Sequence, residues 1–187
     1  TVTQANAESI ASAAPGRPLV LDQQILYFAR YWFAEQQIAA DLRALMQAVT
    51  LPAEPAQLKR YLDQLFGAES LAASASDAFA QINWQKLACA NSLRSRFSVI
   101  TGGPGTGKTT TVVKLLLVLQ QLQQQQGAAP LTIQLAAPTG KAAVRLRSSI
   151  RNTLDKLPAS AEIKNQVPTD VSTLHKLLGA RAQSRQF

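Results

Sequence analysis

The sequence has one cysteine, one histidine and one methionine in 187 residues, and no long run of apolar residues. The single cysteine, Cys89, excludes an internal disulfide and a zinc site built from cysteines. An uninterrupted apolar stretch of about 18 residues, as a membrane span needs, is missing. The opening TVTQANAESI also lacks the basic-then-apolar order of a secretory signal. We therefore expect neither export nor membrane insertion, and a cytoplasmic location.

Acidic residues are scarce in the second half of the chain. Residues 85–187 hold 14 Lys/Arg against 3 Asp/Glu, a net of +11, whereas residues 1–84 hold 5 against 8, a net of −3; together these give +8. A field of positive sign attracts polyanions, of which nucleic acid is the commonest large one. On charge alone, a solvated basic surface without a partner is the alternative.

The N-terminal region is expected to contain a hairpin followed by a helix. Leu19–Leu21 and Ile25–Phe33 are β-branched and aromatic runs separated by three polar residues, which predicts two paired strands. From Ala34 the apolar period becomes helical, and Pro52 and Pro55 are expected to end that helix. The aromatic residues here are expected to pack against a core, with stacking on nucleic-acid bases as the alternative: Tyr27, Phe28, Tyr31, Trp32 and Phe33.

A second helix is predicted over residues 56–66, where leucines recur at spacings of four and three, and Gly67 is placed to terminate it. The small and polar stretch from residue 70 to residue 80 indicates a boundary. We therefore divide the chain into residues 1–80, a mainly helical candidate docking region, and residues 81–187.

The second part alternates between strand and helix patterns. Phe97–Thr101 and Leu131–Ala137 are expected as strands, and Lys108–Gln125 and Gly140–Leu157 as helices. Such alternation predicts an α/β fold with a parallel sheet and crossover helices. The glutamine run Gln120–Gly127 is interpreted as the exposed end of a crossover helix.

A glycine-rich loop carries the clearest chemistry. Gly102, Gly107, Lys108 and Thr109 satisfy the pattern G-x-x-x-x-G-K-[ST] between an expected strand and an expected helix. Glycines let consecutive N–H groups face phosphate oxygens, Lys108 is expected to reach the β and γ phosphates, and the Thr109 hydroxyl is expected to bind Mg²⁺. The full set assigned to nucleotide phosphates is Gly102, Gly103, Pro104, Gly105, Thr106, Gly107, Lys108, Thr109 and Thr110, with Lys108 and Thr109 as the catalytic candidates. Kinases, switches, transporters and motors share such a loop, so it does not choose the reaction.

Three further stretches narrow the choice. WQKLA precedes the loop, and APTGKAA and TLHKLLG come after it in that order. This ordered set resembles the RecD family, the alpha subunit of exodeoxyribonuclease V within superfamily one DNA helicases, from about Pro18 to the end of the chain. The resemblance implies the first part of a RecA-like motor domain. It also implies ATP-driven 5′ to 3′ movement on DNA, RecB and RecC as partners, and double-strand break repair.

The resemblance also assigns residues. Gln85 matches the glutamine that recognises adenine in such helicases, for which a side-chain amide is suited because it both donates and accepts; an ordinary glutamine at a helix start is the alternative. The residues implied for single-stranded DNA are Pro138, Thr139, Gly140, Lys141, Thr173 and His175. For these, capping of a helix, packing or a solvated lysine is the alternative. His175 is the single histidine, which disfavours metal binding and general acid–base catalysis.

ATP hydrolysis needs more than the loop, including an acidic residue that holds Mg²⁺. After Lys108 the only acids are Asp155, Glu162 and Asp170, and none comes directly after an apolar strand. In the family such an acid comes after the TLH segment, so we expect a fragment that binds nucleotide weakly and shows no appreciable ATPase activity. The arginines Arg145, Arg147 and Arg151 either form a solvated helix face or border the DNA strand or a partner subunit.

Other interpretations stay open. One is a free-standing RecD-like helicase or a motor associated with a relaxase. Another is a P-loop kinase or GTP switch, although no N-K-x-D guanine signature is present. A third is a docking module without catalytic activity, formed by the N-terminal hairpin and helices.

Overall fold

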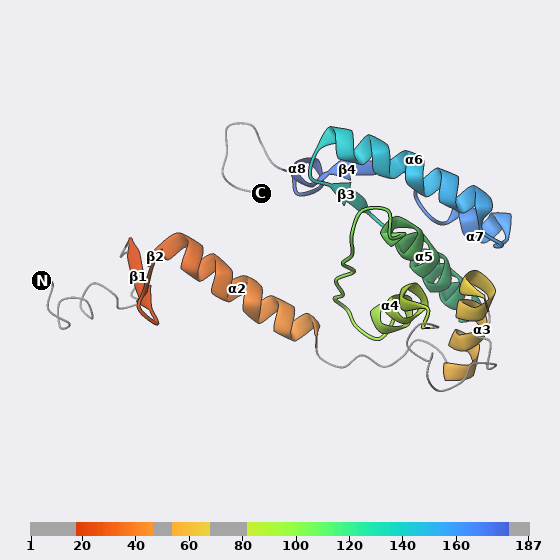
Figure 1. The fold of residues 1–187 in the computed structure, drawn as a ribbon, viewed down its shortest axis with the longest axis horizontal. Helices are drawn as coiled ribbons and strands as arrows, with labels where there is room; N and C mark the ends of the chain where they lie inside the picture. The colour runs from red at the N-terminus through yellow and green to blue at the C-terminus, as the bar shows by residue number, and fades with distance from the viewer. Residues whose placement is uncertain (1–17, 47–53, 68–81, 180–187) are drawn as a thin grey trace, which may run out of the picture. The chain divides into compact units, whose positions relative to one another are not determined.

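The computed structural model describes residues 18–46, 54–67 and 82–179, and the chain divides into two compact units, Thr1–Ala48 and Val49–Phe187. In the first unit, strands β1 (Leu19–Asp22) and β2 (Ile25–Phe28) pair antiparallel, and helix α2 (Ala29–Leu45) comes directly after β2 (Figure 1). Gln23 and Gln24 form the two-residue turn with φ angles of 44° and 70°. Positive φ at both central residues is the geometry whose twist matches that of paired strands. The hairpin prediction is therefore confirmed.

Helix α2 begins earlier than the sequence pattern indicates. The prediction of strand for residues 29–33 is wrong, because β1 begins at Leu19, whose pairing partner is Phe28, and leaves later residues without a strand to pair with. The backbone N–H of Ala29 instead donates to the Pro18 carbonyl at 2.8 Å. Trp32 Nε1 donates to Asp22 Oδ2 at 3.2 Å, which joins the first turns of the helix to the hairpin.

The second unit starts with a helix that the sequence analysis assigned to the N-terminal region. Helix α3 (Pro55–Phe66) opens with a proline, so the expectation that Pro55 ends a helix is wrong; proline suits the first helical position because no intrahelical donor is needed there. Pro52 lies outside the described residues. Gly67 ends α3 with φ 87°, as expected. By packing, helix α3 belongs to the second unit. The boundary at residue 80 concerns function rather than packing, and it stays a prediction.

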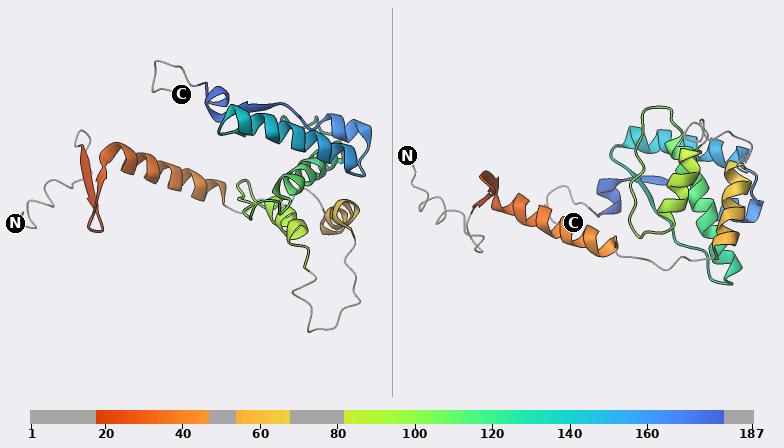
Figure 2. Two further views of the ribbon diagram at one scale, coloured as in Figure 1. Left: turned by 45° about the horizontal axis from the view of Figure 1, so that its top comes forward. Right: turned by 60° about the horizontal axis from the view of Figure 1, so that its bottom comes forward.

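Helix α5 (Lys108–Gln125) lies at the centre of this unit. It contacts α3 and α4 (Trp84–Ser92), and it also contacts α6 (Gly140–Lys156) and α7 (Ala161–Asn165) (Figures 1 and 2). Apolar side chains from these elements form one core, with Val113, Leu117 and Val118 of α5 almost fully buried. In the part of the chain that the structure describes, no helix is long and apolar enough to cross a bilayer.

Strands β3 (Leu135–Ala137) and β4 (Val171–Thr173) pair in parallel, and α6 and α7 connect them. This crossover arrangement confirms the expected α/β class. The final helix, α8 (Leu174–Leu177), continues from β4 without a break. The helices predicted over residues 108–125 and 140–157 are confirmed within one residue.

Two strand predictions are corrected. The segment 97–101 does not form a strand, and residues 131–134 are not part of β3. A strand requires a hydrogen-bonded neighbour, and within the described residues β3 and β4 pair only with each other. Val99 is accordingly 68% exposed despite its apolar side chain.

The glutamine run is also corrected over its first half, where Leu122 is buried as well as Gln120, and Gln121 and Gln123 are half-buried. Gln120 has no exposed surface, whereas the later residues 124–127 are exposed as expected. Its side-chain amide donates to the carbonyls of Leu131 and Gln166, at 3.0 and 2.9 Å. Gln120 therefore joins α5 to two loops of the second unit.

Candidate nucleotide and nucleic-acid site

The glycine loop immediately precedes α5, and a Cβ added at either of two of its glycines would crowd a neighbouring side chain. Gly107 has φ 81°, and a Cβ built there would lie 2.5 Å from Nε2 of Gln85. A Cβ on Gly102 would lie 2.8 Å from Oγ1 of Thr106. Both close contacts are with side-chain atoms, so the positive φ of Gly107 is the stronger reason for glycine in this loop.

The N-terminus of α5 is open to an anion. Gly107 occupies the cap position and provides no side-chain hydrogen bond, whereas α6 and α8 are capped by the hydroxyls of Thr139 and Thr173. The first-turn N–H groups of a helix have no partner within the helix, and the helix dipole favours negative charge there. Lys108, Thr109 and Thr110 form this first turn. Phosphate oxygens fit such an end without further groups.

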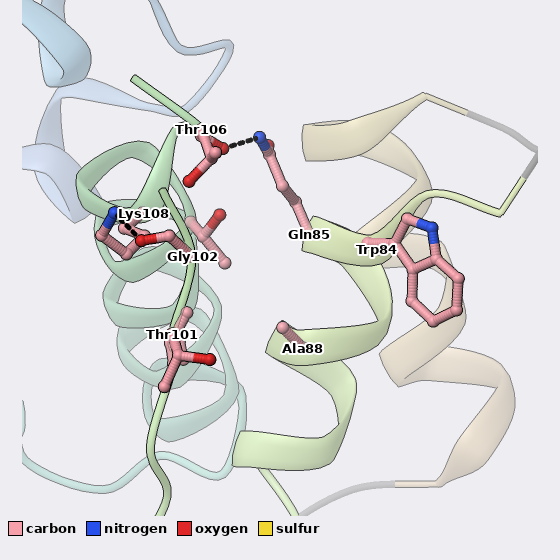
Figure 3. Close-up of a pocket in the computed structure, with 9 residues that line it drawn as sticks. Trp84, Gln85, Ala88, Thr101, Gly102, Thr106 and Lys108 are labelled. Carbon is pink, nitrogen blue, oxygen red and sulfur yellow. Dashed lines mark hydrogen bonds between the residues drawn. The ribbon is translucent and has the colours of Figure 1, made fainter. Parts of the chain in front are cut away.

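Lys108 lies over the loop that precedes it. Its Nζ donates to the Gly102 carbonyl at 2.7 Å (Figure 3). It also donates to the Gly103 carbonyl at 2.6 Å. Thr106 Oγ1 also donates to the Gly103 carbonyl, at 3.0 Å. The ammonium group is thus held at the mouth of the loop, where a phosphate bound by the loop amides would meet it. The residues present fit a nucleotide phosphate chain.

Gln85 reaches the same loop from helix α4. Its Nε2 donates to the Thr106 carbonyl at 2.9 Å, and Figure 3 shows its side chain directed at Thr106. The Trp84 ring points away from the loop in the same view. A cavity of about 140 Å³ lies between α4 and the loop, lined by Trp84, Gln85, Ala88, Ile100, Thr101, Gly102, Thr106, Lys108 and Thr111. The structure thus brings together Gln85 and Lys108, which lie in separate motifs of the sequence.

Several of these lining residues were not singled out from the sequence. Ala88 lies one helical turn after Gln85, and Thr111 lies one turn after Lys108. Residues three apart on a helix share a face, so their spacing from Gln85 and Lys108 was the signal in the sequence that could have identified Ala88 and Thr111. Thr111 is 1% exposed and donates from Oγ1 to the Gly107 carbonyl at 3.1 Å, which supports the loop from below.

A second cavity, of about 430 Å³, adjoins the first turn of α5. It is lined by Thr109, Thr139, Lys141, Ala142, Arg145, Leu146 and Ser149. Thr109, the residue expected to bind Mg²⁺, therefore faces the same space as two residues expected to contact DNA. Arg145 lies there one turn after Lys141, which favours a role beyond a plain solvated face. Thr110 lines neither of these two cavities.

The two segments expected to contact DNA leave the sheet side by side. Ala137 and Thr173 are partners in the parallel register, so Pro138 and Leu174 continue from the same edge. Pro138, Thr139, Gly140 and Lys141 are exposed there, and so is His175. Ligands of open parallel sheets gather at this carboxyl edge.

Both threonines at this edge also cap helices. Thr139 Oγ1 accepts from the backbone N–H of Ala142 at 3.2 Å, and Thr173 Oγ1 accepts from that of Lys176 at 3.3 Å. The capping alternative therefore describes what these hydroxyls do in the structure. A hydroxyl that accepts in a cap keeps its own proton free to donate to a phosphate oxygen.

The three acids located after Lys108 lie away from Thr109. Glu162 accepts from Gln124 at 2.7 Å, and residues 109 and 124 are about 22 Å apart along a helix. Asp170 precedes β4, at the edge opposite the site, and pairs with Arg147 at 3.4 Å. Asp155 lies in the last turn of α6. Over the described ranges there is no group of three or more potential metal ligands.

Cys89 lies behind the site, on the side of α4 that meets α5. It has no exposed surface, and burial raises the pKa of its thiol to about 12. Burial lowers the pKa of the nearby Lys114, whose Nζ lies 4.0 Å from the centre of the Phe66 ring. This cation–π contact joins α5 to α3, and the protonated thiol has no chemical role in the site.

Fold and site together define an α/β protein of the P-loop class, with a partial RecA-like domain. The chain belongs to the AAA domain family, whose model matches residues 85–187, more than half of its length. It is 41% identical over 170 residues to the RecBCD enzyme subunit RecD of Haemophilus influenzae, which covers 88% of this chain and 24% of that relative. The RecD of Mycolicibacterium smegmatis is 39% identical over 173 residues, covering 91% and 28%.

A more distant relative, the RecD of Buchnera aphidicola subsp. Acyrthosiphon pisum, is 30% identical over 178 residues, 95% of this chain. The resemblance to RecD inferred from the ordered motifs is therefore confirmed. The chain spans about a quarter of the length of these curated relatives.

Proposed function

We propose that this chain carries the ATP-binding part of a RecD-type DNA helicase subunit. The observation that carries the proposal is the uncapped start of α5, with Lys108 held over a glycine loop whose last residue, Gly107, has positive φ. The AAA domain match and the RecD relatives support a helicase-type ATPase. ATP with Mg²⁺ is the proposed cofactor.

Each residue of the loop has a proposed task. The backbone N–H groups of residues 103 and 105–109 and the Lys108 ammonium hold the phosphates, and Lys108 neutralises charge on the β and γ groups. Thr109 provides a hydroxyl ligand for Mg²⁺. Gln85 reads the base, since its side chain lines the same cavity as Lys108. When bound, the metal would supply charge neutralisation on the transferred phosphoryl group.

Single-stranded DNA is the proposed polymeric ligand. The carboxyl edge of β3 and β4 exposes Pro138, Thr139, Gly140, Lys141 and His175, with Thr173 half-buried beside them. Thr109 and Lys141 line one cavity, so strand contacts and Mg²⁺ binding would be neighbours. A change in the position of Thr109 when the nucleotide binds or leaves would therefore occur close to the edge of the sheet that is proposed to bind DNA. The net positive charge of residues 85–187 supports association with a polyanion.

We further propose that the whole protein works with RecB- and RecC-type subunits in recombinational repair of double-strand breaks, in the cytoplasm, and moves 5′ to 3′. The names of the relatives, RecBCD enzyme subunit RecD, support this assembly. For residues 1–187 alone we propose nucleotide binding without appreciable turnover, because the acids after Lys108 lie away from Thr109.

The exposed side chains of the first unit support an additional role, the docking of partner proteins. Its hairpin and helix expose large apolar side chains to solvent, among them Leu26, Phe28, Tyr31, Ile38 and Met46, each more than half exposed. Exposed apolar groups of this size mark surfaces that bind other proteins. Capture of RecB- and RecC-type subunits by the chain, lost when Leu26 and Phe28 are changed to Ser, would support it. Unaltered capture by that variant would count against it.

Calorimetric titration of the chain with Mg–ATP tests the nucleotide site. Saturable binding is expected, and Lys108→Ala is expected to weaken it by at least about tenfold, since it removes a charge-assisted contact. Lys164→Ala is the matched control, because Lys164 lies on α7 outside both cavities. Equal affinity of the wild type and Lys108→Ala would contradict the assignment. ATP hydrolysis by residues 1–187 at the rate of a complete helicase would contradict the proposed lack of turnover.

A further inference from the structure

Helices α3 and α4 are joined by an ion pair at the residue next to Gln85. Lys86 Nζ lies 2.6 Å from Asp63 Oδ1. Lys86 is 6% exposed and is the one charged residue that is buried within the described ranges. Burial of a charge is unfavourable unless partners compensate it, and replacement of such pairs by apolar groups is often tolerated. The Asp63 side chain is 24% exposed, so the buried member of the pair is Lys86, and burial of its charge calls for an explanation other than stability.

Asp63 also pairs with a second lysine, which is exposed. Lys59 Nζ lies 2.9 Å from Asp63 Oδ2, one turn earlier on α3, and its side chain is 64% exposed. The hydrogen bond from Lys86, followed by that from Lys59, holds the pKa of the Asp63 carboxyl below its ordinary value. The two lysines share one carboxylate but differ in burial and in the helix that carries them, so each is a control for the other.

The first turn of α4 is fixed at two points on either side of Gln85. Asn83 Oδ1 accepts from the backbone N–H of Lys86 at 3.0 Å, which caps the helix. The Lys86 side chain is held by Asp63. Successive residues on a helix point about 100° apart, so Lys86 faces α3 while Gln85 faces the glycine loop. A shift of α4 against α3 would move Gln85 against the loop.

Gln85 has little freedom at the loop. Its Nε2 donates to the Thr106 carbonyl at 2.9 Å, and it occupies the space where a side chain at Gly107 would begin. One N–H of Nε2 is engaged with the Thr106 carbonyl, and Oε1 is the acceptor that the amide offers to a bound base. The 6-amino group of adenine donates to such an acceptor, whereas the 6-oxo group of guanine is itself an acceptor.

We propose that Lys86 and Asp63 are positioning residues that hold Gln85 against the loop and thereby set a preference for adenine over guanine nucleotides. Neither residue touches the nucleotide; both act through the placement of α4. Helix α3 is then part of the nucleotide site, although sequence patterns place it in another region. The inference rests on the proposed nucleotide binding and adds the specificity of that site.

Calorimetric titration of the chain with Mg–ATP and Mg–GTP tests this proposal. We expect the wild type to prefer ATP by about tenfold, the difference that one hydrogen bond contributes. Lys86→Met removes the buried charge and is expected to reduce the preference to less than about twofold, mainly through weaker ATP binding. Lys59→Met, the exposed partner of the same carboxylate, is expected to keep the wild-type preference. A merely structural role would lower the affinity for both nucleotides in the same proportion.

A second variant covers the case in which Lys86→Met does not fold. The double change Asp63→Leu with Lys86→Met replaces both members of the pair by apolar groups. We expect this protein to melt near the wild-type temperature and to lack the ATP preference. Retention of the wild-type preference by the folded double variant would overturn the proposal.

The remaining outcomes separate this inference from the proposed function. Gln85→Ala is expected to lose the preference as Lys86→Met does. If Gln85→Ala keeps it, or if the wild type binds ATP and GTP equally, the positioning role is overturned while nucleotide binding stands. If the wild type binds neither nucleotide, the proposed function fails and this inference fails with it.

Discussion

The side chain of Gln120 pairs with the backbone of Leu131 as a second peptide group would. Its Nε2 donates to the Leu131 carbonyl at 3.0 Å, and its Oε1 accepts from the Leu131 N–H at 2.9 Å. The same Nε2 donates to the Gln166 carbonyl at 2.9 Å. Gln120 thus provides a buried hydrogen-bonding centre for two loops that flank the β3–α6–α7–β4 crossover.

Loss of this centre is expected to destabilise the second unit. Gln120→Leu keeps the side-chain size but leaves three part-buried backbone groups without their partner, which costs about 2 kcal/mol. For a domain of this size we expect the melting temperature to fall by roughly 4–8 °C, measured by circular dichroism. Gln124→Leu is the control, since Gln124 is exposed and bonds only to the Glu162 carboxylate among the described residues. Equal melting temperatures for the two variants would show that the buried position of Gln120 does not determine the loss of stability.

Gly107→Ala is expected to impair both stability and nucleotide binding. Its φ of 81° strains any side chain by about 1 kcal/mol, and the added Cβ would lie 2.5 Å from Gln85 Nε2. Gly127→Ala shares the strain, with φ 67°, but its Cβ would meet open space. Thermal melting is expected to show similar losses, while calorimetry with Mg–ATP is expected to show loss of binding for Gly107→Ala alone. Normal ATP affinity of Gly107→Ala would contradict the described contact between α4 and the loop.

Lys141→Ala is expected to weaken binding of a single-stranded oligonucleotide by about three- to tenfold. It is also expected to reduce the slope of log affinity against log salt by about 0.7, the value for one phosphate contact on a single strand. Lys156→Ala is the matched control, because Lys156 is an exposed lysine in the last turn of the same helix, far from the carboxyl edge of the sheet. Fluorescence anisotropy at several salt concentrations measures both quantities. The same loss for both variants would indicate general charge attraction rather than a site at the sheet edge.

The Asp63 pair predicts a pH dependence of stability. The folded pKa of Asp63 lies below its ordinary value because Lys86 and then Lys59 donate to its carboxylate. The stabilisation is therefore fully present above the unfolded pKa of about 4, and it is lost as the pH falls through the lower, folded value. Urea denaturation at several pH values below about 5 is expected to show this decline in the wild type and a smaller one in Asp63→Asn. Parallel declines in both proteins would exclude Asp63 as the cause.

Much of the site could be predicted because its chemistry depends on residue order within short segments. The pattern from Gly102 to Thr109 specifies a tight turn and then a helix, and the structure has both. The strands were harder to predict. The segment 97–101 has the composition of a strand, but strand formation depends on a neighbour that no local pattern reveals. Residues 29–33 have a similar composition and are helical, since the pairing of Leu19 with Phe28 ends the hairpin before them.

The sequence by itself determined the phosphate loop, the helix after it, the α/β alternation and the likeness to RecD, since each depends on spacing along the chain. Tertiary structure alone decided which distant residues meet. Gln85 reaches Thr106, Thr109 shares a cavity with Lys141, and Lys86 pairs with Asp63. Such contacts depend on how helices α3, α4 and α6 pack around α5, and packing is set by the shape of buried faces rather than by neighbouring letters.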